Sequence, residues 1–232
     1  MEAIILAGGL GTRLRHLVPD LPKPMAVVGG KPFLEIVLQR LAAAGFEHIV
    51  LSIGYMSEKI ISHFGSQFQG MRLSYEIETS PLGTGGALRN ALDVCKTDHA
   101  FVLNGDSYLE LDYQALEDMW CAQRMPVIVG RRVEDVARYG QLVVDGKHVL
   151  DFLEKTGQGA GVINAGCYVL PKTILNDFAR DSVFSLESDF LAPQVRLQDF
   201  LVYVAEGYFI DIGIPQDYLR AQQEMAGGKF AA

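Results

Sequence analysis

The most informative stretch of the sequence is a glycine-rich loop that directly follows an apolar segment near its beginning. The loop reads Leu6-Ala7-Gly8-Gly9-Leu10-Gly11-Thr12-Arg13-Leu14. Because glycines lack a Cβ, their backbone N–H groups can approach and surround phosphate oxygens. Leu14 stands where the dinucleotide fingerprint needs its last glycine, and no Gly-Lys-Ser/Thr follows as it does in a P-loop. The sequence therefore predicts a phosphate-binding turn of a different kind.

Two cationic side chains accompany this loop. Arg13 lies within it, and Lys23 follows in the segment Pro22-Lys23-Pro24. An arginine offers a planar fork for two oxygens, whereas a lysine offers a point charge, here on a backbone that prolines restrict. A glycine turn alone is often no more than a tight turn. Together with the two cations, it favours binding of a polyphosphate that gains charge during a reaction.

Two aspartates could hold a metal ion beside such a phosphate. Asp106 follows a buried apolar run through Asn104-Gly105, and Asp211 follows Phe209-Ile210 far along the chain. Carboxylates at strand ends suit hard cations, and Mg²⁺ needs few protein ligands because phosphate and water complete its shell. Either aspartate alone is more often a turn or capping residue. The hypothesis therefore depends on the two carboxylates lying close together.

A second glycine-rich turn reads Pro81-Leu82-Gly83-Thr84-Gly85-Gly86-Ala87. Its small residues would allow a flat ring to lie against the backbone, whose N–H and C=O groups could hydrogen-bond to the edge of the ring. The alternative is a plain strand-to-helix connection, in which Thr84 serves as the helix cap.

The first half of the chain alternates strands and helices. Strands are predicted at Ala3–Ala7, His48–Ile53, Arg72–Ile77 and Ala100–Leu103. Helices are predicted at Pro32–Ala44, where Pro32 starts the helix and Gly45 ends it, at Ser57–Phe64, where Ser57 is the cap, and at Thr84–Val94. This alternation implies right-handed crossovers and a mostly parallel sheet that helices cover on both faces.

The second half is richer in strands. Strands are predicted at Val127–Arg131, Gln141–Val144, His148–Leu153, Val162–Leu170 and Leu201–Ala205, with a hairpin at Asp145-Gly146 and helices at Pro171–Phe178 and Pro215–Met225. We expect a single α/β domain over residues 1–226, with a Rossmann-like, mostly parallel central sheet flanked by helices and antiparallel additions in the second half. Residues 227–232 are expected to form a flexible tail.

Composition excludes several classes of function. The 232 residues carry 20 basic and 28 acidic side chains, a net charge of −8, which disfavours a nucleic-acid partner. No apolar run approaches the roughly 18 residues of a membrane span, and the first residues do not resemble a signal peptide. Cys95, Cys121 and Cys167 are odd in number and far apart, which disfavours a disulfide framework or a structural zinc site. We expect a cytoplasmic protein without a membrane partner. The sequence leaves undecided whether it forms a homo-oligomer.

Taken together, Gly-Gly-Leu-Gly-Thr-Arg-Leu, Pro-Lys-Pro, Asn-Gly-Asp and Asp-Ile-Gly resemble, in order and over nearly the whole chain, the motifs of sugar-1-phosphate nucleotidyltransferases. These enzymes join a nucleoside triphosphate to a sugar 1-phosphate and release pyrophosphate. The resemblance implies a nucleotide-diphospho-sugar transferase fold, Mg²⁺ bound by Asp106 and Asp211, and catalytic roles for Arg13 and Lys23. It also implies a set of nucleotide-binding residues, namely Leu6, Ala7, Gly8, Gly9, Gly11, Thr12, Gly83, Thr84 and Gly105.

The same resemblance implies a pocket for the sugar phosphate. Lys155 would bind the phosphate, and Glu154, Asn164 and Glu187 would hydrogen-bond to sugar hydroxyls, because a polyol needs convergent polar groups. Taken alone, Glu154 and Lys155 are an ordinary surface pair. The full predicted set is Tyr139, Gly140, Glu154, Lys155, Asn164 and Glu187.

The proposed chemistry needs no general base. A phosphate monoester has a second pKa near 6, so the attacking oxygen is already mostly ionised at neutral pH. No histidine lies in these motifs, and His16, the nearest, is interpreted as a loop residue. Catalysis would then consist of positioning and charge neutralisation.

Within the family, the motifs most resemble members that use GTP and a heptose 1-phosphate to make GDP-heptose for bacterial surface glycans. Thymidylyltransferases carry Pro-Lys-Gln where this chain has Pro22-Lys23-Pro24. Mannose, glucose or N-acetylmuramate 1-phosphate with GTP or UTP are alternatives that share the same catalytic residues. A non-catalytic regulatory homologue is disfavoured by the intact Arg13, Lys23, Asp106 and Asp211, and a dinucleotide-dependent oxidoreductase by the interrupted glycine fingerprint.

Overall fold

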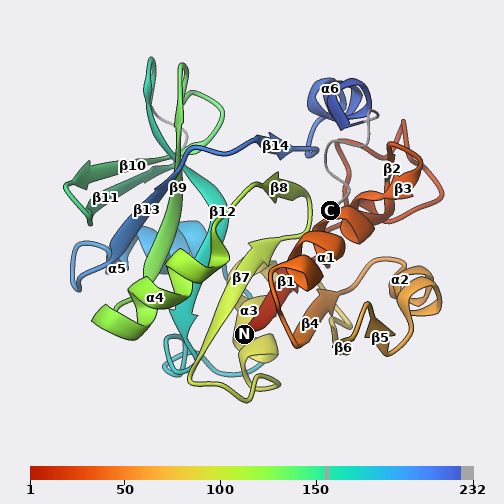
Figure 1. Ribbon diagram of the computed structural model, residues 1–232, viewed down its shortest axis with the longest axis horizontal. Coiled ribbons are helices and arrows are strands. Elements are labelled where there is room, and N and C mark those ends of the chain that lie inside the picture. Colours follow the sequence, from red (N-terminus) through yellow and green to blue (C-terminus); the bar gives the residue numbers. More distant parts are fainter. Residues whose placement is uncertain (155–156, 226–232) are drawn as a thin grey trace.

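A computed structural model of the protein describes residues 1–154 and 157–225, and it is built around one ten-stranded sheet (Figure 1). In spatial order the strands are β10 (Gly140–Asp145), β11 (His148–Glu154), β13 (Leu201–Ala205), β9 (Val127–Val133), β12 (Gly161–Pro171), β7 (His99–Asn104), β1 (Glu2–Leu6), β4 (His48–Ile53), β6 (Met71–Ile77) and β5 (Gln67–Phe68).

The sheet has a parallel part and a mixed part. Strands β7, β1, β4 and β6 are mutually parallel, because α1 (Phe33–Ala43), α2 (Ser57–Phe64) and α3 (Gly83–Leu92) each return the chain to the same edge. Beyond β7, β12 pairs antiparallel with both β7 and β9, and β10 and β11 form the predicted hairpin. The predicted fold class, a mostly parallel sheet with antiparallel additions in the second half, is confirmed.

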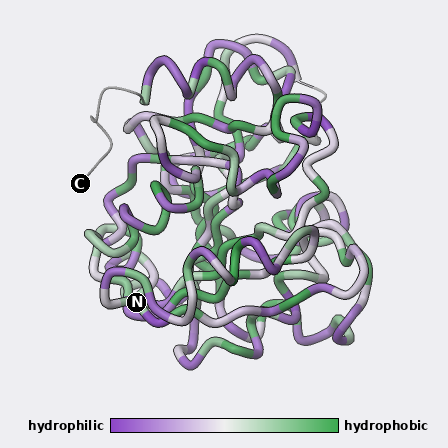
Figure 2. The backbone as a smooth tube through the Cα atoms, turned by 90° about the vertical axis from the view of Figure 1, so that its right-hand side faces the viewer, coloured by the Kyte–Doolittle hydropathy of each residue, from purple (hydrophilic) through white to green (hydrophobic). Residues whose placement is uncertain are grey.

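Helices cover both faces of the sheet. Alternate residues of β1 show the two layers: Ala3 and Ile5 pack into one hydrophobic cluster and Ile4 into the other, and all three are fully buried. The first cluster also includes residues of α1, α2, α4 (Tyr113–Gln123) and α6 (Pro215–Met225). The second includes residues of α3 and of the π-helix η2 (Leu186–Leu191), with α5 (Ala192–Gln194) packed beside η2. Hydrophobic stretches of the chain run through the middle of the molecule (Figure 2).

Short elements outside the main sheet carry part of the predicted chemistry. The 3₁₀ turn η1 (Lys23–Met25) leads into the hairpin of β2 (Val27–Val28) and β3 (Lys31–Pro32). Separately, β14 (Phe209–Asp211) pairs antiparallel with β8 (Ser107–Leu109) and leads into α6 (Figure 1). Among the described residues, no helix has the length and apolar character needed to cross a membrane.

Several local predictions were wrong. Pro171 ends β12, and the residues predicted as a helix to Phe178 form successive turns, such as Ile174 N–H to the Pro171 carbonyl at 3.0 Å. Asn176 and Asp177 in this stretch favour turns over helix. Pro32 immediately precedes α1 instead of starting it.

Ser57 is not a cap either, because Met56 holds that position in the left-handed conformation. Helix α4 was not predicted, although Asp112 caps it by accepting the Ala115 N–H at 3.0 Å. The single domain over 1–226 stays a prediction, and the predicted tail at 227–232 lies outside the described residues.

Candidate active site

A cavity of about 290 Å³ lies at the carboxyl ends of parallel strands β1, β6 and β7. This is the sheet edge at which ligands bind in open α/β folds. Both predicted glycine-rich turns and the Asn104-Gly105-Asp106 segment contribute to it. Its lining consists of Leu6, Ala7, Gly8, Gly9, Leu10, Lys23, Pro24, Glu78, Pro81, Gly83, Thr84, Ala87, Asn104, Gly105 and Asp106.

Close contacts explain why glycine occupies two of these positions. A Cβ added at Gly8 would lie 2.0 Å from Oε1 of Glu78. One added at Gly105 would lie 3.0 Å from the Leu6 carbonyl oxygen, to which the Gly105 N–H donates at 2.9 Å. The missing side chains therefore allow the ends of β1, β6 and β7 to converge around one cavity.

Most of the predicted nucleotide-binding residues line this cavity, but two do not. Gly11 has a φ of +58°, and an added Cβ there would lie 2.9 Å from Cβ of Lys23. The positive φ and the missing Cβ of Gly11 therefore allow the turn to pack against Lys23. Thr12 is exposed beside it. Thr84 lines the cavity but does not cap α3, since Leu82 holds that position and makes no side-chain cap. The nucleotide-binding roles themselves stay predictions.

The two predicted metal-binding aspartates are brought together by the small sheet. Asp211 of β14 pairs with Ser107, the residue after Asp106, and the Ile212 N–H donates to the Asp106 carbonyl oxygen at 2.9 Å. Nζ of Lys23 forms an ion pair with Oδ2 of Asp106. The Asp106 and Asp211 carboxylates thus share one site with the predicted catalytic lysine, as the hypothesis required.

The electrostatics of this site are dominated by the two carboxylates. Burial raises the pKa of Asp211, and the neighbouring charge of Asp106 raises it further. Lys23, the Gly213 N–H at 2.6 Å and Arg13 lower it in part. Arg13 is exposed, yet close enough to act on Asp211. Two cations therefore face two carboxylates, and the pair of acids carries an unfavourable repulsion.

Two of the predicted sugar-phosphate residues, Asn164 and Glu187, belong to one hydrogen-bond network. The Asn164 side chain donates Nδ2–H to the Tyr168 hydroxyl at 2.7 Å, and that hydroxyl donates to Glu187. Oε2 of Glu187 also accepts from the Thr84 hydroxyl at 2.7 Å and from the Ser185 hydroxyl at 3.1 Å. The network therefore connects Asn164 and Glu187, two residues predicted to bind the sugar phosphate, to Thr84 in the nucleotide cavity.

The other residues predicted to bind the sugar phosphate come from two short segments of the chain. Tyr139 is half-buried and packs edge-on against Phe209, with ring centroids 6.2 Å apart. Gly140 begins β10, where an added Cβ would meet the ring of Phe152 at 2.9 Å. Glu154 ends β11. Lys155 lies outside the described residues, so its predicted contact with the phosphate stays a prediction.

Sequence reasoning missed two residues of this site. Glu78 follows strand β6 directly and lines the cavity; the rule that pointed to Asp106, a carboxylate at the end of a parallel strand, would have found it. Tyr168 is fully buried within β12. Burial and the charge of Glu187 raise its pKa, so its hydroxyl stays a donor. Nothing in the apolar run around Tyr168 distinguishes it from a core residue.

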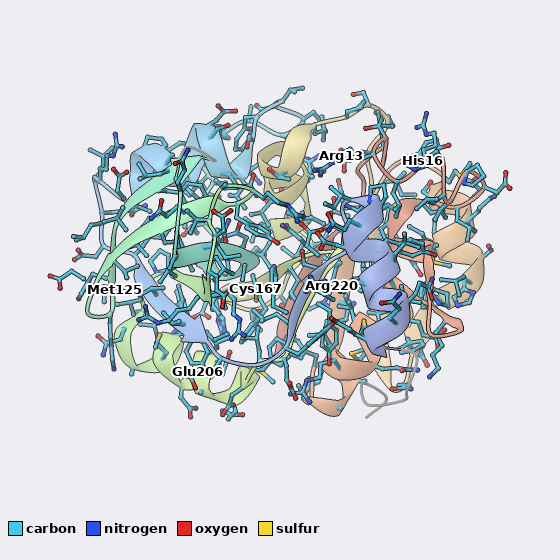
Figure 3. All side chains as sticks on the ribbon, turned by 90° about the horizontal axis from the view of Figure 1, so that it is seen from above. Arg13, His16, Met125, Cys167, Glu206 and Arg220 are labelled. Atoms are coloured by element: carbon cyan, nitrogen blue, oxygen red, sulfur yellow. The ribbon has the colours of Figure 1, made fainter. Side chains whose placement is uncertain are left out.

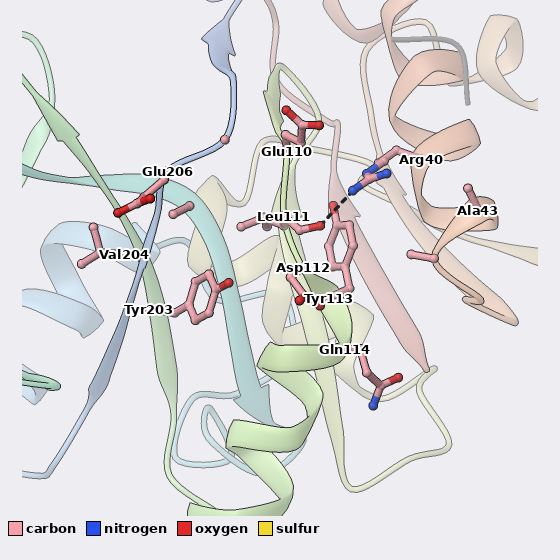
Figure 4. Close-up of a pocket in the computed structure, with 13 residues that line it drawn as sticks. Arg40, Ala43, Glu110, Leu111, Asp112, Tyr113, Gln114, Tyr203, Val204 and Glu206 are labelled. Atoms are coloured by element: carbon pink, nitrogen blue, oxygen red, sulfur yellow. Dashed lines mark hydrogen bonds between the residues drawn. The ribbon is translucent and has the colours of Figure 1, made fainter. Parts of the chain in front are cut away.

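A second, larger cavity of about 740 Å³ shares no lining residue with the first (Figure 4). Glu110, Asp112 and Glu206 give it an acidic lining, and its one arginine, Arg40, donates to the Leu111 carbonyl oxygen at 3.0 Å. Such a lining disfavours phosphates. The smaller cavity is therefore the better candidate for the predicted polyphosphate site.

Comparison with known proteins agrees with this geometry. The chain matches the nucleotidyl transferase family over residues 2–227. It is 37% identical over 226 residues to the D-glycero-alpha-D-manno-heptose 1-phosphate guanylyltransferase of Aneurinibacillus thermoaerophilus, covering 97% of this chain and 98% of the relative. It is 40% identical over 219 residues to the enzyme of that name from Campylobacter jejuni subsp. jejuni serotype O:2, covering 94% and 97%.

The crystal structure of HddC from Yersinia pseudotuberculosis superimposes with a TM-score of 0.85 at 42% identity, covering 96% of this chain and 98% of that one. A second structure of HddC is a complex with GMP-PN. The family predicted from the motifs is confirmed: the chain belongs to the nucleotidyl transferase family.

Proposed function

We propose that this protein transfers a guanylyl group from GTP to D-glycero-α-D-manno-heptose 1-phosphate, forming GDP-heptose and releasing pyrophosphate. Support comes first from the guanylyltransferases of that name, which resemble the chain over almost their whole length. The heptose phosphate is proposed as the sugar substrate on this similarity, and the reaction would take place in the cytoplasm.

The observation that carries the choice of nucleotide is Glu78. It is half-buried in the cavity, where Oε2 accepts the Leu82 N–H at 3.1 Å and Oε1 points toward Gly8. An ionised carboxylate only accepts hydrogen bonds and can receive two parallel ones. Guanine presents two adjacent donors, N1–H and the N2 amino group, whereas adenine, cytosine, uracil and thymine have no two adjacent donors along that edge. Glu78 therefore fits guanine best.

A divalent cation, Mg²⁺ in our proposal, fits the paired carboxylates. Among the described residues, no three His, Cys, Asp or Glu side chains gather into a metal site. A cation would therefore rely on Asp106, Asp211 and substrate oxygens, which suits Mg²⁺. It would also relieve the repulsion that raises the pKa of Asp211. When bound, it would neutralise charge on the triphosphate.

The protein's own residues would do the rest of the chemistry. The sugar phosphate oxygen attacks the α-phosphorus of GTP without losing a proton to the protein, because it is already ionised. Arg13 and Lys23 stabilise the charge that accumulates on the α-phosphoryl group and on the departing pyrophosphate. Glu187, whose Oε2 accepts from the hydroxyls of Thr84 and Ser185, would also accept a hydrogen bond from a sugar hydroxyl.

A pyrophosphate-release screen tests the proposal. Four nucleoside triphosphates are crossed with heptose, mannose, glucose and N-acetylmuramate 1-phosphates in the presence of Mg²⁺. We expect the highest kcat/KM for GTP with the heptose phosphate. Preference for another nucleotide or acceptor would overturn that half of the proposal, and no pyrophosphate from any pair would overturn all of it.

A substitution tests the role of Glu78 separately. Glu78→Gln replaces one acceptor with a donor, so kcat/KM for GTP should fall by about 10²-fold, the discrimination that a good bidentate contact supplies. Glu58→Gln, on the exposed surface of α2, is the matched control and should change nothing. Unchanged use of GTP by Glu78→Gln would remove Glu78 from the base contact.

A further inference from the structure

A buried carboxylate outside the site described so far joins two arginines. Asp217, on the first turn of α6, is only 6% exposed and forms an ion pair with Nη2 of Arg138. Nη2 of Arg220, one turn further along α6, lies 3.4 Å from its Oδ1. Arg138 comes from the segment between β9 and β10, so the contact joins distant parts of the chain.

This cluster lies beside Tyr139, one of the residues predicted to bind the sugar phosphate. The guanidinium of Arg138 sits 5.6 Å from the ring centroid of Tyr139, which packs edge-on against Phe209, two residues before Asp211. Asp217 raises the pKa of Arg138 by accepting its hydrogen bond, and Asp211 is near enough to raise it further. Figure 3 looks onto the face that carries α6, with Arg220 and Arg13 labelled.

Helix α6 also fixes this cluster relative to the catalytic lysine. The Tyr218 hydroxyl donates to the Val27 carbonyl oxygen at 2.8 Å, in the hairpin that follows η1 and Lys23. One helix therefore contacts the hairpin that follows Lys23, through Val27, and the segment that precedes Tyr139, through Arg138. A guanidinium held by Asp217 has a defined position with respect to Lys23.

The charges of the two clusters differ. Asp106 and Asp211 face two cations, Lys23 and Arg13, so that group is balanced before substrates bind. In the cluster of Asp217, Arg138 and Arg220, two guanidiniums share the one carboxylate that they contact, and Asp211 of the first group is the further carboxylate that acts on Arg138. A sugar 1-phosphate brings about −1.5 to −2 charges at pH 7. Half of the Arg138 side chain is exposed, and a guanidinium has donors beyond the one used by Asp217.

We propose that Arg138, held in place by Asp217, binds the phosphate of the acceptor sugar. Arg138 then contacts the nucleophilic phosphate, and Asp217 is a positioning residue that acts through it. This inference rests on the proposed function, because it assumes a sugar 1-phosphate as acceptor. It adds a cation on the acceptor side to the predicted Lys155.

The kinetic test separates the two substrates. Arg138→Gln should raise the KM for the sugar 1-phosphate by about 10- to 100-fold, the range of a charge-assisted hydrogen bond, and change the KM for GTP less than twofold. Asp217→Asn should raise the same KM by a smaller factor, and Arg138→Lys should restore part of the loss. A rise of the GTP KM, or no change in either, would overturn the proposal.

A matched control and a binding measurement complete the experiment. Arg124→Gln removes another arginine–aspartate pair, with Asp98 at the amino end of β7 and thus at the opposite edge of the sheet from Asp106; it should leave both KM values unchanged. Calorimetric titration with the sugar 1-phosphate should show weaker binding to Arg138→Gln than to the wild type. If the wild type binds this ligand but releases no pyrophosphate, the proposed function fails while Arg138 is still tested by the titration.

Discussion

The nucleotide side and the sugar-phosphate side of the proposed active site are built differently. The nucleotide side consists of backbone at the ends of parallel strands, brought close by Gly8 and Gly105 and completed by the side chain of Glu78. The acceptor side consists of side chains from separate elements, such as Asn164 and Glu187, held by hydrogen bonds. A site made of backbone tolerates few residue types at its close contacts, whereas a site made of side chains depends on what supports each one.

The substitution with the largest expected effect lies where the two sides meet. Asp106→Asn removes one of two carboxylates proposed to hold the cation and the partner of Lys23. We expect kcat to fall by about 10³-fold, because metal-assisted charge stabilisation supplies several kcal/mol. Pyrophosphate release at saturating substrates measures it. Asp112→Asn is the control, since asparagine caps a helix as well as aspartate does. Turnover at the wild-type rate would contradict the proposed metal site.

Gly8→Ala tests the nucleotide side. The added Cβ would displace the Glu78 carboxylate, which lies at the end of a flexible side chain, so the fold should survive while the base contact is lost. The KM for GTP should rise about 30-fold, and the KM for the sugar phosphate should stay the same. Gly9→Ala, where an added Cβ meets nothing within 4 Å, shows whether the loop tolerates alanine, through its thermal unfolding midpoint. Equal changes in both KM values would mean that the two sides are not separable here.

The difference between the two sides also explains which site residues the sequence predicts. The loop from Leu6 to Leu14 and Asn104-Gly105-Asp106 are local motifs, and each follows a strand whose apolar run is short and clear, so the parallel sheet and its ligand-binding edge could be predicted. The proximity of Asp211 depends on β14 pairing with β8, which no local pattern encodes. The roles of Tyr168 and Asp217 could not be predicted for the same reason, since several of their partners lie in other elements of the fold.

Tyr168→Phe tests the acceptor side. The phenylalanine keeps the packing of β12 but removes the hydroxyl that accepts from Asn164 and donates to Glu187. We expect the KM for the sugar phosphate to rise about tenfold, the value of one or two hydrogen bonds, with the KM for GTP unchanged. Tyr203→Phe, outside this network on β13, provides the control. A larger effect on GTP would show that Thr84 transmits the loss to the nucleotide cavity.

The smallest kinetic effect is expected at the opposite edge of the sheet, where Glu2 begins β1. Burial raises the pKa of Glu2, but hydrogen bonds from Thr97, His48 and Lys96 outweigh it and bring the value from 4.5 down to about 2. Glu2 is 7% exposed. Because its pKa is lower in the folded state, its ionised form stabilises the fold above pH 4.5, and this contribution is lost as the pH falls from 4.5 to 2.

Glu2→Gln should therefore lower the free energy of unfolding by about 3 kcal/mol at pH 7, and the difference from the wild type should vanish near pH 2. Urea unfolding at several pH values measures it, with the exposed neighbour Glu47→Gln as the control. Both KM values should stay at wild-type levels, because Glu2 lies at the far end of β1 from the glycine-rich loop. A selective change in either KM would show that loss of stability alone can imitate the side-specific effects, and the contrast between the two sides would then lose its basis.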